Sequence, residues 1–139
     1  MEGDKEMNLG IFRQFTDRIL KGKEKNLGKR GEDIAENYLK KRGYKILARN
    51  FRIKGGEVDI IAEKDGEVVF VEVKTRSSEE FMPVIEAVDF HKRKRIRKAA
   101  EVFLLAKGLY AKPCRFDVIT IVVSGRKVLS FDHIRNVQI

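Results

Sequence analysis

Residues 56–75 read GEVDIIAEKDGEVVFVEVKT, and this stretch decides the fold. Asp65 and Gly66 lie between two runs rich in β-branched residues, a pattern that predicts a β-hairpin with a two-residue type I′ turn. Counting outward from such a turn, one residue on each strand at a time, places Asp59 directly opposite Glu72. The sequence therefore predicts two carboxylates on one face of a tight hairpin.

The predicted carboxylate pair needs a compensating positive charge. Opposed residues have Cβ atoms about 4.5–5.5 Å apart, and like charges at that distance destabilise a sheet. Lys74 lies two residues beyond Glu72 on the same face, so its ammonium converges on Asp59 and Glu72. The three groups fit either a metal site or a surface carboxylate pair balanced by Lys74 and Arg76. The same register places Glu57 opposite Lys74, where we expect a cross-strand ion pair.

Apolar residues occupy both faces of the hairpin, as in strands that are covered on both sides in α/β proteins. One face is expected to carry Val58, Ile60, Val69, Val71 and Val73, and the other Ile61, Val68 and Phe70. The remaining predicted elements are helices at 27–42 and 92–107 and strands at 45–51, 115–123 and 127–131. This order predicts an α/β domain with a central mixed sheet flanked by helices.

The chain divides into an extension at residues 1–26 and a domain at 27–139. The extension is expected to form an amphipathic helix, followed by a basic link. In the first domain helix we expect Gly43 to end the helix. Its inward stripe is predicted to consist of Gly31, Ile34, Ala35, Tyr38 and Leu39.

Charge and cysteine content narrow the partners and the compartment. The net charge of +9 on 139 residues favours a nucleic acid, most simply DNA, over a membrane surface. Thermal adaptation also raises charge content, but it adds both signs. No apolar run approaches the roughly 18 residues of a membrane span. With Cys114 as the single cysteine and no signal peptide, the reducing cytoplasm is the expected compartment. A homodimer is one state that the sequence allows.

One run of basic residues on the second predicted helix is a candidate phosphate contact. It comprises Lys92, Arg93, Lys94, Arg95, Arg97 and Lys98. A solvated helix face is the plainer interpretation, but a run of one sign repels itself and favours a phosphate partner. The inward stripe of this helix is predicted to consist of Ile96, Ala99, Ala100, Phe103 and Leu104. Lys92 lies one turn before Ile96 on that stripe, which directs it towards the carboxylates. Lys29, Arg30 and Arg76 are secondary candidates.

The spacing of Asp59 from Glu72-Val73-Lys74, preceded by a helix bearing Glu32, resembles the PD-(D/E)XK nuclease superfamily. The wider pattern over residues 27–123 is similar to the bacterial YraN-like family, which is grouped by fold with archaeal Holliday-junction resolvases. The blocks that carry this resemblance are residues 28–32, 38–39, 43–44, 49–50, 56–61, 70–76 and 115–118, together with Ala35. The resemblance implies a restriction-endonuclease-like fold and a nuclease of branched or structured DNA.

The resemblance also implies roles for the site residues. Asp59, Glu72 and the backbone carbonyl of Val73 would hold Mg²⁺ or Mn²⁺, which prefers oxygen ligands. Lys74 would orient the attacking water or stabilise charge on the phosphate, and Glu32 would complete the site. The alternative for Glu32 is a solvated helix residue or a charge that stabilises the N-terminal end of the helix.

Three functions remain open at this point. The favoured one is a metal-dependent endonuclease, and its rival is a binding module for nucleic acid or a partner that keeps the fold without turnover. A third is an RNA-associated or ribosome-associated protein. His91, His133 and Asp117 are expected to be structural, because neither histidine has a partner at a ligand spacing.

Overall fold

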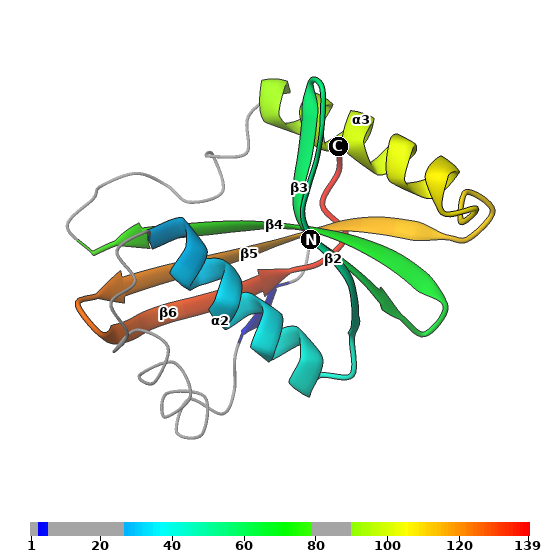
Figure 1. The fold of residues 1–139 in the computed structure, drawn as a ribbon. Helices are drawn as coiled ribbons and strands as arrows, with labels where there is room; N and C mark the ends of the chain where they lie inside the picture. Colours follow the sequence, from blue (N-terminus) through cyan, green and yellow to red (C-terminus); the bar gives the residue numbers. More distant parts are fainter. Residues whose placement is uncertain (1–2, 6–26, 79–89) are drawn as a thin grey trace.

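The computed structural model describes residues 3–5, 27–78 and 90–139, and it has the expected α/β architecture. A mixed sheet is covered by one helix on each face (Figure 1). This arrangement is compatible with a restriction-endonuclease-like fold. The elements are β1 (Gly3–Lys5), α2 (Leu27–Lys41), β2 (Lys45–Ile53), β3 (Gly56–Lys64), β4 (Glu67–Ser77), α3 (Phe90–Ala106), β5 (Cys114–Ser124) and β6 (Lys127–Ile134).

The strand order in the sheet is β1-β6-β5-β4-β3-β2. Strands β4 and β5 are parallel and are joined through α3, whereas every other neighbouring pair is antiparallel. The short strand β1 pairs with β6 and was not expected from the sequence. The amphipathic helix predicted in the extension lies outside the described residues.

Helix α2 has the inward stripe that its sequence predicts. Gly31, Ile34, Ala35, Tyr38 and Leu39 are all buried, and the apolar members pack on the face of the sheet formed by β3 to β6. The helix ends at the expected place. Gly43 takes a φ of +89° and the amide of Tyr44 donates back to the Leu39 carbonyl.

The hairpin turn and its register are confirmed. Asp65 and Gly66 have φ values of 52° and 80°, as a type I′ turn requires. The β3–β4 ladder runs from Lys64 opposite Glu67 to Ile60 opposite Val71. The ladder ends there, because β3 leaves β4 at Asp59.

The part of β3 that precedes Asp59, paired with β2, runs alongside α3 (Figure 1). The contact with the helix is close, since a Cβ placed on Gly56 would lie 2.6 Å from the Arg95 carbonyl oxygen. Val58 consequently packs in the core beneath α3, on the face opposite to Ile60. The expectation that these two residues share a face was wrong, because the strand changes direction between them.

Candidate active site

Asp59 occupies the point at which β3 separates from β4. Its Oδ2 accepts a hydrogen bond of 2.8 Å from the Val73 amide. The ladder with β4 ends at Ile60, so the carboxylate binds an amide that lies beyond the paired part of the strands. Strand irregularities of this kind redirect side chains and recur beside active sites.

The carboxylates of Asp59 and Glu72 meet as the register predicts. Burial, then the Glu72 charge and a hydrogen bond between the two groups, raises the pKa of Asp59 to about 7. The Val73 amide and the Lys92 charge act in the opposite direction. Near neutral pH, Asp59 therefore exchanges its proton readily, and a bound cation would take the place of that proton.

The ammonium that contacts this pair belongs to Lys92. Its Nζ lies 2.5 Å from Glu72 Oε2, close enough for an ion pair. Burial lowers the pKa of Lys92, but attraction to Glu72 and Asp59 outweighs this effect and the net shift is upward. Lys74 is half-buried and makes no hydrogen bond or ion pair within residues 27–78 and 90–139.

Glu32 lies close enough to Asp59 for the two charges to interact. Burial and the Asp59 charge raise the pKa of Glu32, while Asn50 and Arg49 act to lower it through hydrogen bonds. The Arg49 guanidinium lies 3.2 Å from Glu32 Oε1. Tight packing of α2 on β4 holds Glu32 here, because a Cβ on the neighbouring Gly31 would overlap Thr75.

The expected ion pair between Glu57 and Lys74 is absent from the described residues. Glu57 instead lies 3.5 Å from Arg52 Nε on the adjacent strand β2. The cause is the departure of β3 from β4 at Asp59, since residues before that point no longer face β4.

The predicted phosphate contacts differ in exposure. Lys29 is exposed and pairs with Asp33, and Arg30 is half-buried. Arg76 is buried, so a phosphate contact would require its side chain to move. On α3, Lys92 and Arg93 are half-buried, while the exposed members of the basic run are Lys94, Arg95, Arg97 and Lys98.

A hollow of about 290 Å³ lies at the start of α3, and one of its lining residues, Lys92, contacts Glu72. It is lined by Glu57, His91, Lys92, Arg95 and Ile96. Two basic side chains from the first two turns of α3, Lys92 and Arg95, therefore border a hollow that reaches the residue paired with Glu72.

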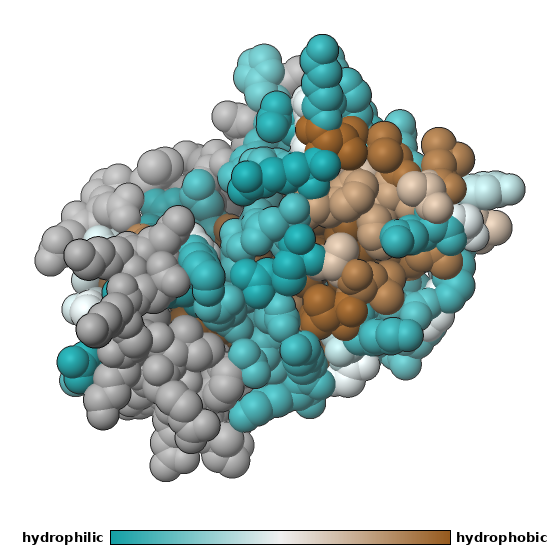
Figure 2. All heavy atoms as spheres, viewed as in Figure 1, coloured by the Kyte–Doolittle hydropathy of each residue, from teal (hydrophilic) through white to brown (hydrophobic). Residues whose placement is uncertain are grey.

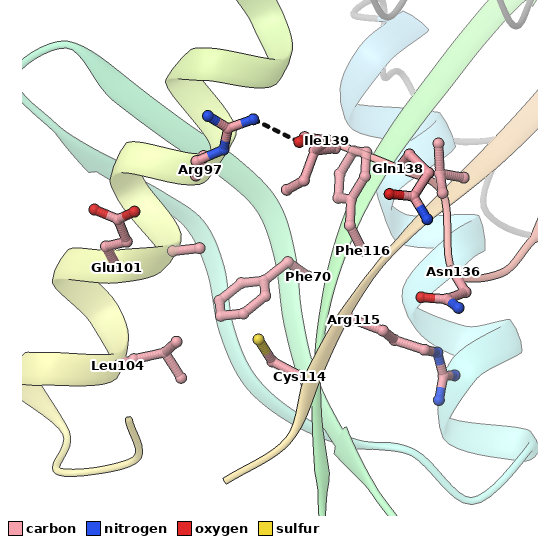
Figure 3. A pocket seen from close by; sticks show the side chains of 12 residues that line it. Phe70, Arg97, Glu101, Leu104, Cys114, Arg115, Phe116, Asn136, Gln138 and Ile139 are labelled. Atoms are coloured by element: carbon pink, nitrogen blue, oxygen red, sulfur yellow. Dashed lines mark hydrogen bonds between the residues drawn. The ribbon is translucent and has the colours of Figure 1, made fainter. Parts of the chain in front are cut away.

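A second hollow, of about 380 Å³, lies elsewhere on the α3 side and contains neither carboxylate of the pair. Figure 3 shows it between α3, the start of β5 and residues 136–139. Arg97 borders it and donates to the backbone oxygen of Ile139. Figure 2 shows apolar residues gathered on this side of the molecule, in contrast to the hydrophilic surface around α2.

The oxygen donors at the acidic pair fit a divalent cation. Glu72 is 2% exposed and its buried Oε2 has no hydrogen-bond partner in the described residues, while the Asp59 carboxylate lies close enough to be repelled by its charge. Mg²⁺ is typically held by one or two carboxylates together with water and phosphate oxygens. No cluster of three or more His, Cys, Asp or Glu side chains suited to a metal occurs among the described residues. The protein would therefore supply the pair and the Val73 carbonyl, and the substrate the rest.

Sequence reasoning missed two features around this site. Arg49 lies between Glu32, Asp33 and Glu36 and neutralises one side of α2. Asn50 has a φ of 50° and hydrogen-bonds Glu32. The asparagine offered a signal, because Asn adopts the left-handed region more readily than most residues.

A third missed feature is a buried polar network under α2, away from the acidic pair. Asp117 and His133 are fully buried, and His133 Nε2 lies 2.8 Å from Asp117 Oδ2. The Tyr38 hydroxyl lies 3.0 Å from His133 Nδ1, and Arg115 Nε donates to Asp117 Oδ1. These contacts agree with the structural role expected for Asp117 and His133.

No helix in the described part of the chain is long and apolar enough to cross a membrane.

Comparison with known proteins gives a consistent family assignment. A profile described as "Uncharacterised protein family UPF0102" matches residues 31–121. A UPF0102 protein of Dictyoglomus turgidum is 42% identical over 81% of this chain and 96% of its own length. Another, from Caldanaerobacter subterraneus subsp. tengcongensis, is 44% identical over 85% of this chain and 98% of its own. A third, from Geotalea uraniireducens, is 47% identical over 81% and 88%.

Proposed function

Since the chain belongs to the family described as Uncharacterised protein family UPF0102, we propose its function from the geometry of its site: a metal-dependent nuclease that hydrolyses phosphodiester bonds of branched or structured DNA. The observation that carries the proposal is the buried Asp59–Glu72 pair. Burial and mutual repulsion raise the pKa of Asp59 to about 7, which costs stability at neutral pH, and perturbed carboxylates of this kind cluster at functional sites.

Each residue of the site has a proposed role. Asp59, Glu72 and the Val73 carbonyl would hold Mg²⁺ or Mn²⁺, which would polarise the phosphoryl oxygen and activate water. Lys74 has an ammonium that is not engaged elsewhere in residues 27–78 and 90–139, so it is available to orient water or to stabilise charge on the phosphate. Glu32 would act on the same centre through its electrostatic contact with Asp59.

Exposed basic residues support nucleic acid as the substrate class. Lys94, Arg95 and Lys98 on α3 carry the positive charge that phosphate contacts require, and Arg95 also borders the hollow lined by Lys92. The choice of branched DNA rests on the resemblance to resolvases.

A second candidate is a binding module that keeps this fold without turnover. The observation in its favour is the ion pair of Lys92 with Glu72, which partly neutralises the acidic pair without a metal. Both functions share the nucleic-acid surface and differ only in cleavage.

The test is a cleavage assay with the full chain. Duplex, flap, four-way-junction and RNA substrates would each be incubated with Mg²⁺, with Mn²⁺ and with chelator. We expect cleavage of the branched DNA that depends on metal and stops with chelator. Binding of these substrates without cleavage under any metal would favour the binding module, and cleavage confined to RNA would overturn the choice of DNA.

A further inference from the structure

The ammonium of Lys92 lies where a metal ion bound to Glu72 would lie. Its Nζ lies 2.5 Å from Glu72 Oε2, and the Glu72 side chain is 2% exposed. Mg²⁺ binds oxygen at about 2.0–2.1 Å, so an ammonium 2.5 Å from Oε2 lies within the space that the metal ion would need. An ammonium and a divalent cation cannot occupy that space together, and their charges repel each other.

We propose that Lys92 is a built-in competitor for the divalent-cation site, so that metal binding displaces its ammonium from Glu72. This inference rests on the metal site of the proposed function. In the metal-free protein Lys92 balances one buried carboxylate, which limits the electrostatic cost of holding Asp59 and Glu72 together. When the metal binds, it replaces the ammonium of Lys92 at a carboxylate whose charge was already balanced.

The displaced side chain has a place to go. Lys92 is in the first turn of α3, its side chain is 32% exposed, and it borders the hollow of about 290 Å³ with Arg95. Once released, its ammonium would face the same space as an incoming phosphate. Metal and nucleic acid should therefore bind with positive coupling, and by linkage each should raise the affinity of the other by the same factor.

The geometry separates this role from that of Lys74. Lys74 lies on β4 and makes no ion pair within the described ranges, so a metal need not displace it. Lys92 comes from α3 and holds Glu72 directly. Loss of Lys74 should leave metal affinity nearly unchanged, whereas loss of Lys92 should increase it.

The test is titration calorimetry with Mn²⁺ at pH 8 on the parent chain and on Lys92→Met. We expect Lys92→Met to bind Mn²⁺ about tenfold more tightly or better, because removal of a positive charge a few ångströms away favours the cation. Lys94→Met is the matched control, since it removes an exposed charge from the same helix and should bind like the parent. Lys92→Arg keeps the charge and should also bind like the parent.

Folding is checked by thermal melting, because Lys92→Met leaves Glu72 without its ammonium. Lys92→Gln keeps a hydrogen-bond donor for Glu72 and serves as the second neutral variant. Mn²⁺ affinity of a folded neutral variant that equals that of Lys94→Met, or is weaker, would overturn the proposal. Loss of the coupling between Mn²⁺ and DNA binding in Lys92→Met, with coupling kept in Lys94→Met, is the second expected result.

The outcome is independent of cleavage. Tighter Mn²⁺ binding by Lys92→Met together with no cleavage by the parent would support the competitor and remove the nuclease function. Cleavage by the parent with unchanged Mn²⁺ affinity in Lys92→Met would support the nuclease function and overturn the role of Lys92 as a competitor.

Discussion

At the scale of single residues, Asp59 is held in an environment that disfavours its charge. Burial is the main cause and the Glu72 carboxylate is the second, and together they raise the pKa of Asp59 to about 7 from 3.8. A folded state that binds this proton more tightly than the unfolded chain loses stability as pH rises through the interval between these two values. The protein therefore gives up stability at neutral and alkaline pH to keep the carboxylate pair.

Asp59→Asn should remove this cost, because asparagine carries no charge and its carbonyl can still accept from the Val73 amide. With chelator present we expect the variant to exceed the parent by at least about 1 kcal/mol at pH 8, given about 1.4 kcal/mol per pKa unit. The melting temperature should rise by about 3 °C. At pH 5 the advantage should shrink, since the parent is then protonated. Thermal melts at both pH values measure this, and an equal difference at both would refute the assignment.

At the scale of elements, the β3–β4 hairpin shows what sequence could and could not provide. The register followed from the two-residue turn at Asp65 and Gly66, because that turn leaves one pairing for the strands. The end of the ladder at Ile60, next to Asp59, could not be predicted from the turn, since it depends on packing against α3. The faces assigned to Val58 and Glu57 were wrong for that reason.

The helix α3 shows the same division for the candidate site. Its inward stripe and the approach of Lys92 to the carboxylates followed from helical spacing. Helical spacing could not show whether Lys74 or Lys92 contacts Glu72, because α3 and β4 meet only in the folded chain. Arg49 and the Asp117–His133 pair were missed for a similar cause, since their partners lie on other elements.

The exposed basic face of α3 should bind phosphates without reading bases. Replacing Lys94, Arg95 and Lys98 with alanine should weaken DNA binding similarly across sequences. Each lost phosphate contact should lower the slope of log affinity against log salt by about 0.9 on duplex DNA. Melting should change little, because all three side chains are exposed. Fluorescence anisotropy over a series of salt concentrations measures the slope.

The matched control for this triple variant removes the same charge elsewhere. Lys107, Arg126 and Lys127 are exposed and lie outside the basic run. Their replacement should change the salt slope much less. Equal effects of the two triple variants would mean that net charge alone drives binding and that α3 has no special part in it.

At the scale of the whole molecule, a buried polar network joins elements distant in the chain. Asp117 on β5 binds His133 on β6, Arg115, and the backbone amide of Asn136, while Tyr38 of α2 contacts the far side of His133. Burial acts to raise the pKa of Asp117, but these hydrogen bonds outweigh it and the pKa is lowered. The ionised carboxylate therefore stabilises the fold at any pH above the ordinary aspartate range.

Asp117→Asn should destabilise the protein by about 2 kcal/mol at pH 7, because Arg115 loses its charge-assisted hydrogen bond to Asp117 although it keeps its ion pair with Glu67. The loss should persist from pH 5 to 8 and diminish as acid protonates Asp117 in the parent. Chemical denaturation across this pH range measures the difference. Parent-like stability of the variant at pH 7 would contradict the role of the network.

We propose that Asp59 and Lys74 act in phosphodiester cleavage while other residues hold the nucleic acid. Single-turnover cleavage of a four-way junction with Mn²⁺, with affinity measured on the same samples, tests it in the parent, Asp59→Asn and Lys74→Ala. We expect the parent to cleave the junction and both variants to lose about a hundredfold or more in rate. The affinity of each variant for the junction should stay within a few-fold of the parent. Parent-like cleavage by Asp59→Asn would contradict it.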